Sequence, residues 1–372
     1  MSEWLTLCVP TINRPAFLGR LLRYYAAASA PYRIAIADSS DPVRAEQNQQ
    51  IIRRLAGRLH VVYRQYPGMS VGACFEAMNQ TLDTPYCALL GDDDFLCPPG
   101  LERCVEFLEG HPDYGAAHGI GLHFQTEGGH PHGPIGRVGP YPQAVLETDT
   151  GAQRLGEFVM KSLYVLIYSV HRAAIWRSMF TGVGAMEDIK TQNGFKNEVL
   201  ATCVSAVRGK VKALDGLYLF RQVHQRNTPV PHVYEWLTDP EWFPSYRIFE
   251  DRVSEELMRQ DQLPMEQARQ IVRDVFWSYL AKVMMGVREK ELRRPSRQGT
   301  LSSLRRAARA IPWLRRSGRA ARSMFDRYQR PWSLSALLHP SSPYHTDFMA
   351  VARAVEDLRQ TVEQPSGEAV AV

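Results

Sequence analysis

The sequence predicts an α/β fold with a mostly parallel central sheet, followed by a mainly α-helical C-terminal region. Between residues 5 and 90, short apolar runs alternate with helical patterns. Three aspartates, Asp92, Asp93 and Asp94, directly follow the fourth apolar run. Strand signals end near residue 240, where helical patterns separated by Pro and Gly take over. Such alternation is typical of a parallel sheet whose faces are covered by helices.

Each expected element follows from the spacing of its apolar residues. The N-terminal strands are expected over 5–9, 33–37, 59–63 and 86–90, and the helices between them over 16–28, around 51–55 and over 74–82. Residues 111–139 are rich in Gly, His and Pro, so we expect mostly loop there. Beyond this stretch we expect a strand over 164–170, a helix over 197–207 and a strand over 217–220.

Composition and cysteine usage restrict the class of protein. With 45% hydrophobic and 22% charged residues, the 372-residue chain has ordinary globular usage, which excludes a wholly disordered protein. The six cysteines form no CxxC pair, so we expect free thiols in a reducing compartment. No apolar stretch is long enough to span a membrane, and no secretory signal is recognised at the N-terminus. We therefore expect a soluble, cytoplasmic protein.

The positive charge is concentrated in one C-terminal segment, residues 296–330. This segment holds ten arginines and one acid, Asp326, so the remainder of the chain is slightly acidic although the net charge is +5. Apolar residues recur there at helical spacing, and basic amphipathic helices commonly lie on anionic membrane surfaces. A helix packed on the core with a solvated arginine face is an equal alternative. Nucleic-acid binding is not favoured, because no recognised nucleic-acid module accompanies the charge.

The aspartate cluster Asp92–Asp94 is the most informative motif. Adjacent carboxylates repel one another unless a cation or hydrogen-bond donors lie among them. In a parallel α/β sheet, ligands bind beyond the carboxyl ends of the strands, where this cluster is expected. Carboxylate oxygens suit Mg²⁺ or Mn²⁺, which can bridge to a diphosphate. The alternative is a solvated acidic turn before a helix.

Three segments together resemble a known family. Val9–Pro15 (VPTINRP) resembles the opening VPTxNRP segment of inverting family 2 glycosyltransferases, whose GT-A fold is Rossmann-like. Ala37–Ser40 resembles the end of their second strand, and Leu89–Asp94 resembles their DxD region. The resemblance covers roughly residues 4–228. It implies a glycosyltransferase domain over 1–232 and a helical region over 233–372.

The resemblance also implies how the nucleotide-sugar is bound. Pro10 and Thr11 would line the nucleotide pocket, Asn13 or Arg14 would lie near the phosphates, and Asp38 would accept a hydrogen bond from the base. A UDP-linked donor is therefore expected.

Within the triplet, Asp92 would face the ribose or the sugar, and Asp94 would hold the metal, Mn²⁺ or Mg²⁺, on the diphosphate. Asp93 is assigned both to donor binding and to the metal, because many members carry a fourth aspartate where this chain has Gly91.

A later segment resembles the part of the family that carries the catalytic base. Asn197-Glu198, with Arg221 downstream, resembles the ED motif and the following YR segment, which makes Glu198 the base that deprotonates the acceptor hydroxyl. The literal ED at Glu187-Asp188 keeps Asp188 as the second candidate. Arg221 would offset the leaving-group charge, and His224 would complete the metal or phosphate contacts.

Two other motifs are not favoured as sites. His118, His123, His130 and His132 lack the short paired spacing of zinc sites, so we expect an acceptor-facing loop there. The segment Gly68–Gly72 lacks the GK[ST] ending of a phosphate-binding P-loop.

The resemblance implies a metal-dependent glycosyltransferase that acts on a carbohydrate or lipid-linked acceptor. Cell-surface polysaccharide or glycoconjugate synthesis is the expected process, with the protein peripheral on the inner face of the membrane. One alternative is a nucleotidyltransferase, although the expected glycine- and lysine-bearing loop is missing. Another is a non-catalytic nucleotide-sugar-binding protein, because Asn197 replaces the first acid of ED and Gly91 replaces an aspartate.

Overall fold

The computed structural model describes residues 4–161, 165–183, 195–224, 237–240, 242–292 and 332–356. The strands are β1 Leu5–Thr11, β2 Arg33–Asp38, β3 His60–Gln65, β4 Tyr86–Leu89, β5 Phe95–Leu96, β6 Tyr114–Thr126, β7 Ile135–Tyr141, β8 Val170–Arg172 and β9 Lys210–Gln222. The helices are α1 Pro15–Ala27, α2 Pro42–Arg54, α3 Val71–Asn79, α4 Pro98–Gly110, α5 Gly151–Lys161, α6 Ala173–Phe180, α7 Ala201–Arg208, α9 Trp242–Asp261, α10 Met265–Leu292, α13 Leu334–Leu338 and α14 His345–Glu356.

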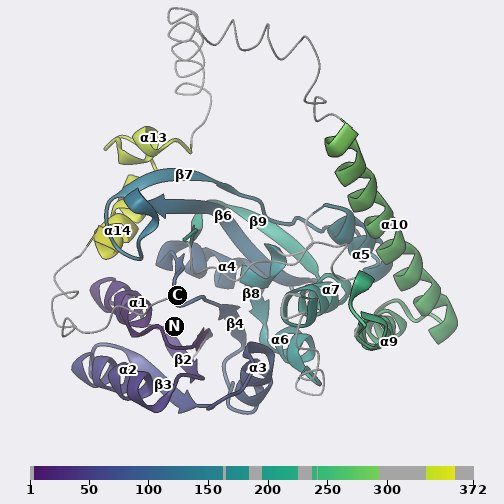
Figure 1. Ribbon diagram of the computed structural model, residues 1–372, viewed down its shortest axis with the longest axis horizontal. Coiled ribbons are helices and arrows are strands. Elements are labelled where there is room, and N and C mark those ends of the chain that lie inside the picture. Colours follow the sequence, from purple (N-terminus) through teal and green to yellow (C-terminus); the bar gives the residue numbers. More distant parts are fainter. Residues whose placement is uncertain are drawn as a thin grey trace, which may run out of the picture.

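Within the described residues, the strands form one nine-stranded sheet (Figure 1). Its order is β3-β2-β1-β4-β8-β6-β9-β5, with β7 paired to β6. The pairings among β1, β2, β3 and β4 are all parallel, which confirms the predicted parallel sheet in this part. Beyond β4 the sheet is mixed, because β8 runs antiparallel to both neighbours while β6 and β9 are parallel. The α/β fold is confirmed.

Local sequence signals explain how the first helices begin. Asp41 caps α2 by accepting a hydrogen bond from the Arg44 amide, and Pro42 occupies the first turn, where its missing N–H costs nothing. Ser70 caps α3 in the same way, through the Ala73 amide. These helices cover buried strands such as β1, whose residues are nearly all inaccessible to solvent.

The prediction of a loop over 111–139 was wrong for most of that stretch, which forms β6 and β7. The glycines that suggested a loop allow close packing instead. A Cβ on Gly115 would lie 3.0 Å from the Gly209 Cα, and one on Gly119 would lie 2.7 Å from the Gly216 oxygen. Glycine in a strand often marks such close approach.

The strand expected over 164–170 was also wrong. Val165–Tyr168 is a 3₁₀ helix, and β8 begins only at Val170.

The C-terminal helices pack on the N-terminal domain at two places. In Figure 1, α9 and α10 lie beside α5 and α7, whereas α14 lies beside α1 and β7. The Phe348 ring of α14 lies 6.0 Å from the Phe220 ring of β9. The predicted helical region is confirmed where it is described, but the 232/233 boundary and segment 296–330 lie outside the described residues.

Two observations bear on the expected environment of the chain. All six cysteines are free, as expected, and all six are also buried. Across the described ranges, no helix is both long and apolar enough to cross a bilayer.

Candidate active site

The predicted site residues meet at the carboxyl ends of β1, β2 and β4. Thr11 and Asp38 are register partners at the ends of β1 and β2. The neighbouring strand β4 leads directly into Gly91 and the aspartate triplet. Pro10 lies one residue earlier in β1, opposite Ala37. Ligands of parallel α/β sheets bind at this edge.

Asp38 is a buried carboxylate held by three donors. Its Oδ1 accepts from the Ser40 amide at 2.8 Å, and its Oδ2 accepts from Asn48 Nδ2 and the Tyr63 hydroxyl, each at 2.7 Å. Only 1% of Asp38 is exposed. The three hydrogen bonds fix the orientation of this carboxylate. Its oxygens have further lone pairs, which can accept a hydrogen bond from a ligand.

Asn13 joins the loops that follow β1 and β2. Its backbone N–H donates to Ser40 Oγ at 2.7 Å, and its side-chain Oδ1 accepts from the backbone N–H of Asp41 at 3.0 Å. The backbone of Asn13 is left-handed, with φ of 56°, a conformation that asparagine tolerates better than most residues. Asn13 therefore serves the shape of this edge through its backbone as well as its side chain.

Thr11 and Arg14 hold the first two aspartates of the triplet. Thr11 Oγ1 donates to Asp92 Oδ2 at 2.8 Å. Arg14 Nη1 lies 3.2 Å from Asp92 Oδ1 and 3.0 Å from Asp93 Oδ2. A Cβ on Gly91 would lie 2.8 Å from Asp93 Oδ1, so the absence of a side chain at Gly91 leaves room for this arrangement.

The end of β9 and the residues after it complete the triplet from the opposite side. The backbone N–H of Gln222 donates to Asp94 Oδ1 at 2.9 Å, and His224 Nε2 lies 2.8 Å from Asp93 Oδ2. The His224 ring stacks on Phe17 of α1 at 5.0 Å. Residues more than 120 positions apart in the sequence are thereby brought into one cluster.

The buried triplet is electrostatically strained. Burial, reinforced by the charge of Asp93, raises the pKa of Asp92 to about 7. Burial and Asp93 also raise the pKa of Asp94 well above its ordinary value. Burial acts in the same direction on Asp93, but the hydrogen bond from His224 and the charge of Arg14 lower its pKa overall. Such a cluster favours a nearby cation.

Arg20 of α1 contacts the backbone of the triplet. Its Nη2 donates to the Asp93 carbonyl oxygen at 2.9 Å, and its Nη1 donates to the Pro131 carbonyl oxygen. The guanidinium also lies over the rings of Phe17 and Phe95, at 5.1 and 5.0 Å. Arg20 thus fixes the backbone of the triplet.

Arg221 lies between two tyrosine rings, those of Tyr141 and Tyr168, each 5.4 Å from its guanidinium carbon. Its Nη1 donates to the Tyr141 hydroxyl at 3.2 Å. Burial lowers the pKa of Arg221, but Tyr168, Asp94 and other neighbouring acids raise it overall, so the residue stays charged. Because Asp94 and Glu198 both contribute, Arg221 is within electrostatic reach of both carboxylates.

Glu198 is partly buried in the helical turn Phe195–Leu200 that precedes α7. Burial raises the pKa of its carboxyl, and the charge of Arg221 opposes this shift. A raised pKa brings a glutamate closer to the range in which a general base is effective. Asp188, the second candidate, lies outside the described residues.

No metal site is already assembled in the described part of the chain, since no three or more His, Cys, Asp or Glu side chains converge as ligands would. Asp93, Asp94 and His224 have suitable donor atoms, but Asp93 pairs with Arg14 and His224 instead. Of the four histidines considered for zinc, His118 is buried, with Nδ1 3.0 Å from the Gly119 oxygen and Nε2 2.6 Å from the Ala144 oxygen.

Four residues around the site were not expected from the sequence: Phe17, Arg20, Tyr141 and Tyr168. Phe17 and Arg20 lie on a helix whose general pattern gave no reason to separate them from core or surface residues. Tyr141 follows the stretch that the sequence predicts as loop, and Tyr168 lies in the segment that it predicts as a strand. The Tyr–Arg–Tyr stack arises only from the packing of β7, the 3₁₀ helix and β9.

Part of the chain is similar to a known family of enzymes. Residues 6–166 match the model of the glycosyl transferase family 2. No curated protein matches the chain. Among solved structures, TarS of S. aureus shares 14% identity and a TM-score of 0.48, over 74% of this chain and 43% of that protein. The chain thus spans less than half the length of TarS.

Two further structures contain bound donors. TarS 1-349 in complex with UDP-GlcNAc shares 14% identity and a TM-score of 0.46, over 74% of this chain and 72% of that one. The mannosyltransferase PcManGT from Pyrobaculum calidifontis, in complex with GDP-Man and Mn²⁺, shares 9% identity and a TM-score of 0.41, over 94% and 86%. The family match includes β1 to β4, Asp38 and the triplet. Over residues 6–166, the chain is therefore similar to the glycosyl transferase family 2.

Proposed function

We propose that the chain is a glycosyltransferase that moves a sugar from a UDP-linked donor to an acceptor hydroxyl, with inversion at the anomeric carbon. One observation carries the proposal: Asp38 and the Asp92–Asp94 triplet share one edge of the parallel strands, within the segment that matches the family 2 model. Asp38 can accept a hydrogen bond from the nucleobase, and the cluster of carboxylates can bind a metal ion beside the diphosphate. The two groups at the same edge therefore suit the two ends of a nucleoside diphosphate.

The donor would bind along this edge. Asp38 would accept a hydrogen bond from an N–H of the base, since its orientation is already fixed by three donors. Pro10 and Thr11 would line the nucleotide pocket, and Asn13 or Arg14 would approach the phosphates. Asp92 would face the ribose or sugar. Arg14 would exchange part of its pairing with Asp92 and Asp93 for phosphate oxygens.

The donor atoms of Asp93, Asp94 and His224 fit Mn²⁺ or Mg²⁺, because carboxylate oxygens and imidazole nitrogen are accepted ligands of these ions. When bound, such an ion would supply charge neutralisation at the diphosphate. Arg221, kept charged between its two tyrosines, would stabilise the same developing charge.

Glu198 would act as the general base. Its carboxylate would accept the proton of the acceptor hydroxyl while that oxygen forms a bond to the anomeric carbon, and the bond from this carbon to the diphosphate oxygen breaks. The nucleoside diphosphate leaves with the bonding electron pair. The raised pKa of Glu198 and its electrostatic interaction with Arg221 support this role. Asp188 remains the alternative base.

The acceptor side of the proposal is broader. We propose a carbohydrate or lipid-linked acceptor in cell-surface polysaccharide or glycoconjugate synthesis. The cytoplasmic protein would then lie on the inner face of the membrane through the ten arginines of 296–330. Sedimentation with phosphatidylglycerol vesicles, compared with phosphatidylcholine vesicles, tests this contact. Equal binding to both would contradict it.

Calorimetric titration tests the donor assignment. UDP, GDP and their sugars are titrated with and without Mn²⁺, first into the wild-type protein and then into Asp94→Asn, with Asp215→Asn as a matched variant of an exposed aspartate. We expect one nucleotide to bind in a Mn²⁺-dependent manner, and Asp94→Asn alone to lose this binding. Absence of binding by every nucleotide would overturn the proposal. Donor binding without turnover on any acceptor would leave the non-catalytic binding protein as the function.

A further inference from the structure

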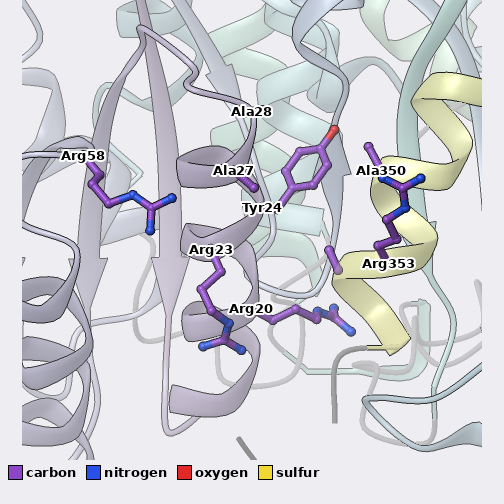
Figure 2. A pocket seen from close by; sticks show the side chains of 9 residues that line it. Arg20, Arg23, Tyr24, Ala27, Ala28, Arg58, Ala350 and Arg353 are labelled. Atoms are coloured by element: carbon purple, nitrogen blue, oxygen red, sulfur yellow. The ribbon is translucent and has the colours of Figure 1, made fainter. Parts of the chain in front are cut away.

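An arginine-lined cavity lies between α1 and α14, outside the proposed donor site. It has a volume of about 450 Å³. It is lined by nine residues: Arg20, Arg23, Tyr24, Ala27, Ala28, Arg58, Ala350, Arg353 and Ala354. Four of these are arginines and none is acidic. Figure 2 shows Arg58 and Arg353 on opposite sides of α1, with Arg20 extending from α1 toward α14.

No acidic residue lines the cavity, although the charges of Asp92, Asp93 and Asp94 act on Arg20. Within the described ranges, neither Arg20, Arg58 nor Arg353 forms an ion pair. Arg58 Nη2 donates to the Ala26 carbonyl oxygen at 3.3 Å. Gathering several guanidinium groups in one cavity costs electrostatic energy, which an anionic ligand would recover.

Arg20 places a buried guanidinium in the wall of the cavity. The residue is 1% exposed, and its Nε has no hydrogen-bond partner among the described residues. Its two terminal nitrogens are already used by the carbonyl oxygens of Asp93 and Pro131.

The rest of the lining is small or apolar. Four alanines leave the space that larger side chains would fill, and the buried ring of Tyr24 forms part of the wall. Guanidinium groups bind phosphoryl oxygens in a bidentate manner, and several of them match more than one phosphate. The apolar lining can accommodate an organic group attached to the phosphates.

From these observations we propose that the cavity between α1 and α14 is a second anion site, which binds a diphosphate group or its ester. It is separate from the donor site, although Arg20 contacts the backbone of the triplet. The diphosphate could belong to a free compound or to the headgroup of a lipid, and the chemistry of recognition is the same for both.

Titration of inorganic pyrophosphate in EDTA tests the site, because without a divalent cation the aspartate triplet repels a diphosphate. The double variant Arg58→Gln/Arg353→Gln removes two exposed arginines, and Arg269→Gln of α10 is the control for loss of a positive charge. We expect the double variant to weaken pyrophosphate binding by about tenfold or more, and the control to have little effect. Absence of binding by the wild-type protein, or equal weakening by the control, would overturn the proposal.

Two added measurements locate the effect and identify the source of the group. The double variant should keep its Mn²⁺-dependent nucleotide binding, so failure of the anion site is distinguishable from failure of the donor assignment. Farnesyl diphosphate is then compared with pyrophosphate. Tighter binding of farnesyl diphosphate that depends on Arg58 and Arg353 supports the site with a lipid-linked ligand, whereas equal affinity supports it with a free diphosphate. Binding of either compound that does not depend on these arginines would contradict the site.

Discussion

The two ends of the proposed active site are built in different ways. At the nucleotide end, Asp38 takes its hydrogen bonds from Ser40, Asn48 and Tyr63, which lie at most 25 positions away in the sequence. At the triplet end, the partners of Asp92–Asp94 come from the start of α1 and from the end of β9, 78 to 131 positions away. One end forms within two neighbouring strand–helix units, and the other requires both halves of the sheet.

The difference extends to what a ligand must do at each end. Asp38 is held by uncharged donors that can stay in place when a base binds. The triplet is held by Arg14 and His224, which are themselves candidates for contact with phosphate and metal. We therefore expect the nucleotide end to bind a ligand without rearrangement, and the triplet end to exchange internal partners for external ones.

The largest effect is expected at Glu198. This residue and Asp94 of the triplet both interact electrostatically with Arg221. Glu198→Gln removes the proposed base and should lower kcat by about 10²–10⁴-fold while donor binding is kept. Release of nucleoside diphosphate in the presence of acceptor measures the rate. The matched variant Asp188→Asn should retain activity. If Asp188→Asn is inactive and Glu198→Gln is not, the base is Asp188. Glu198 then has no catalytic role beside the triplet.

The strain of the triplet predicts a pH-dependent stability. The pKa of Asp92 is raised to about 7 in the folded protein, so the folded chain binds this proton more tightly than the unfolded chain does. Stability should fall as pH rises from about 4 to about 7, by up to about 4 kcal/mol. The stability advantage of Asp92→Asn over the wild-type protein should thus be clearly larger at pH 8 than at pH 5.

Urea unfolding in EDTA at the two pH values measures this difference, with Asp215→Asn as the exposed control. A stability difference that is the same at pH 5 and pH 8 would show that the triplet is not strained.

At the nucleotide end we expect the opposite behaviour. Asp38→Ala leaves Asn48 Nδ2 and the Tyr63 hydroxyl without their buried acceptor, which should lower the free energy of unfolding by about 1–3 kcal/mol. The same variant should weaken the binding of the preferred nucleotide. Urea unfolding and calorimetry measure the two effects. A variant as stable as the wild-type protein would mean that the three donors find other partners, and the nucleotide end would not be prebuilt.

The smallest effect concerns Arg14. Arg14→Gln frees Asp92 and Asp93 from their guanidinium partner, so the affinity for Mn²⁺ in the absence of nucleotide should rise about two- to tenfold, with a change in stability of about 1 kcal/mol or less. Arg44→Gln, which breaks the exposed pair with Asp41, is the control. Unchanged or weaker Mn²⁺ binding would indicate that Arg14 does not compete with the metal.

The parts of the site that were predictable lie on local patterns. The alternation of apolar runs and helices placed Thr11, Asp38 and Asp92–Asp94 at one edge, since the carboxyl ends of parallel strands meet there. β6 and β7 were missed because the glycines of β6 serve close packing against β9, and nothing local distinguishes such glycines from turn glycines. The roles of Asp188 and of segment 296–330 stay predictions.

The sequence by itself determined the four parallel strands, the capped helices between them and the identity of the carboxylates at the strand ends, because each depends on residues close together in the chain. Only the tertiary structure decided which groups pair with those carboxylates, how Arg221 is held between Tyr141 and Tyr168, and that α14 closes an arginine-lined cavity against α1. These features depend on contacts between distant segments and on burial. Burial sets the pKa of Asp92 and Glu198, and no local pattern specifies it.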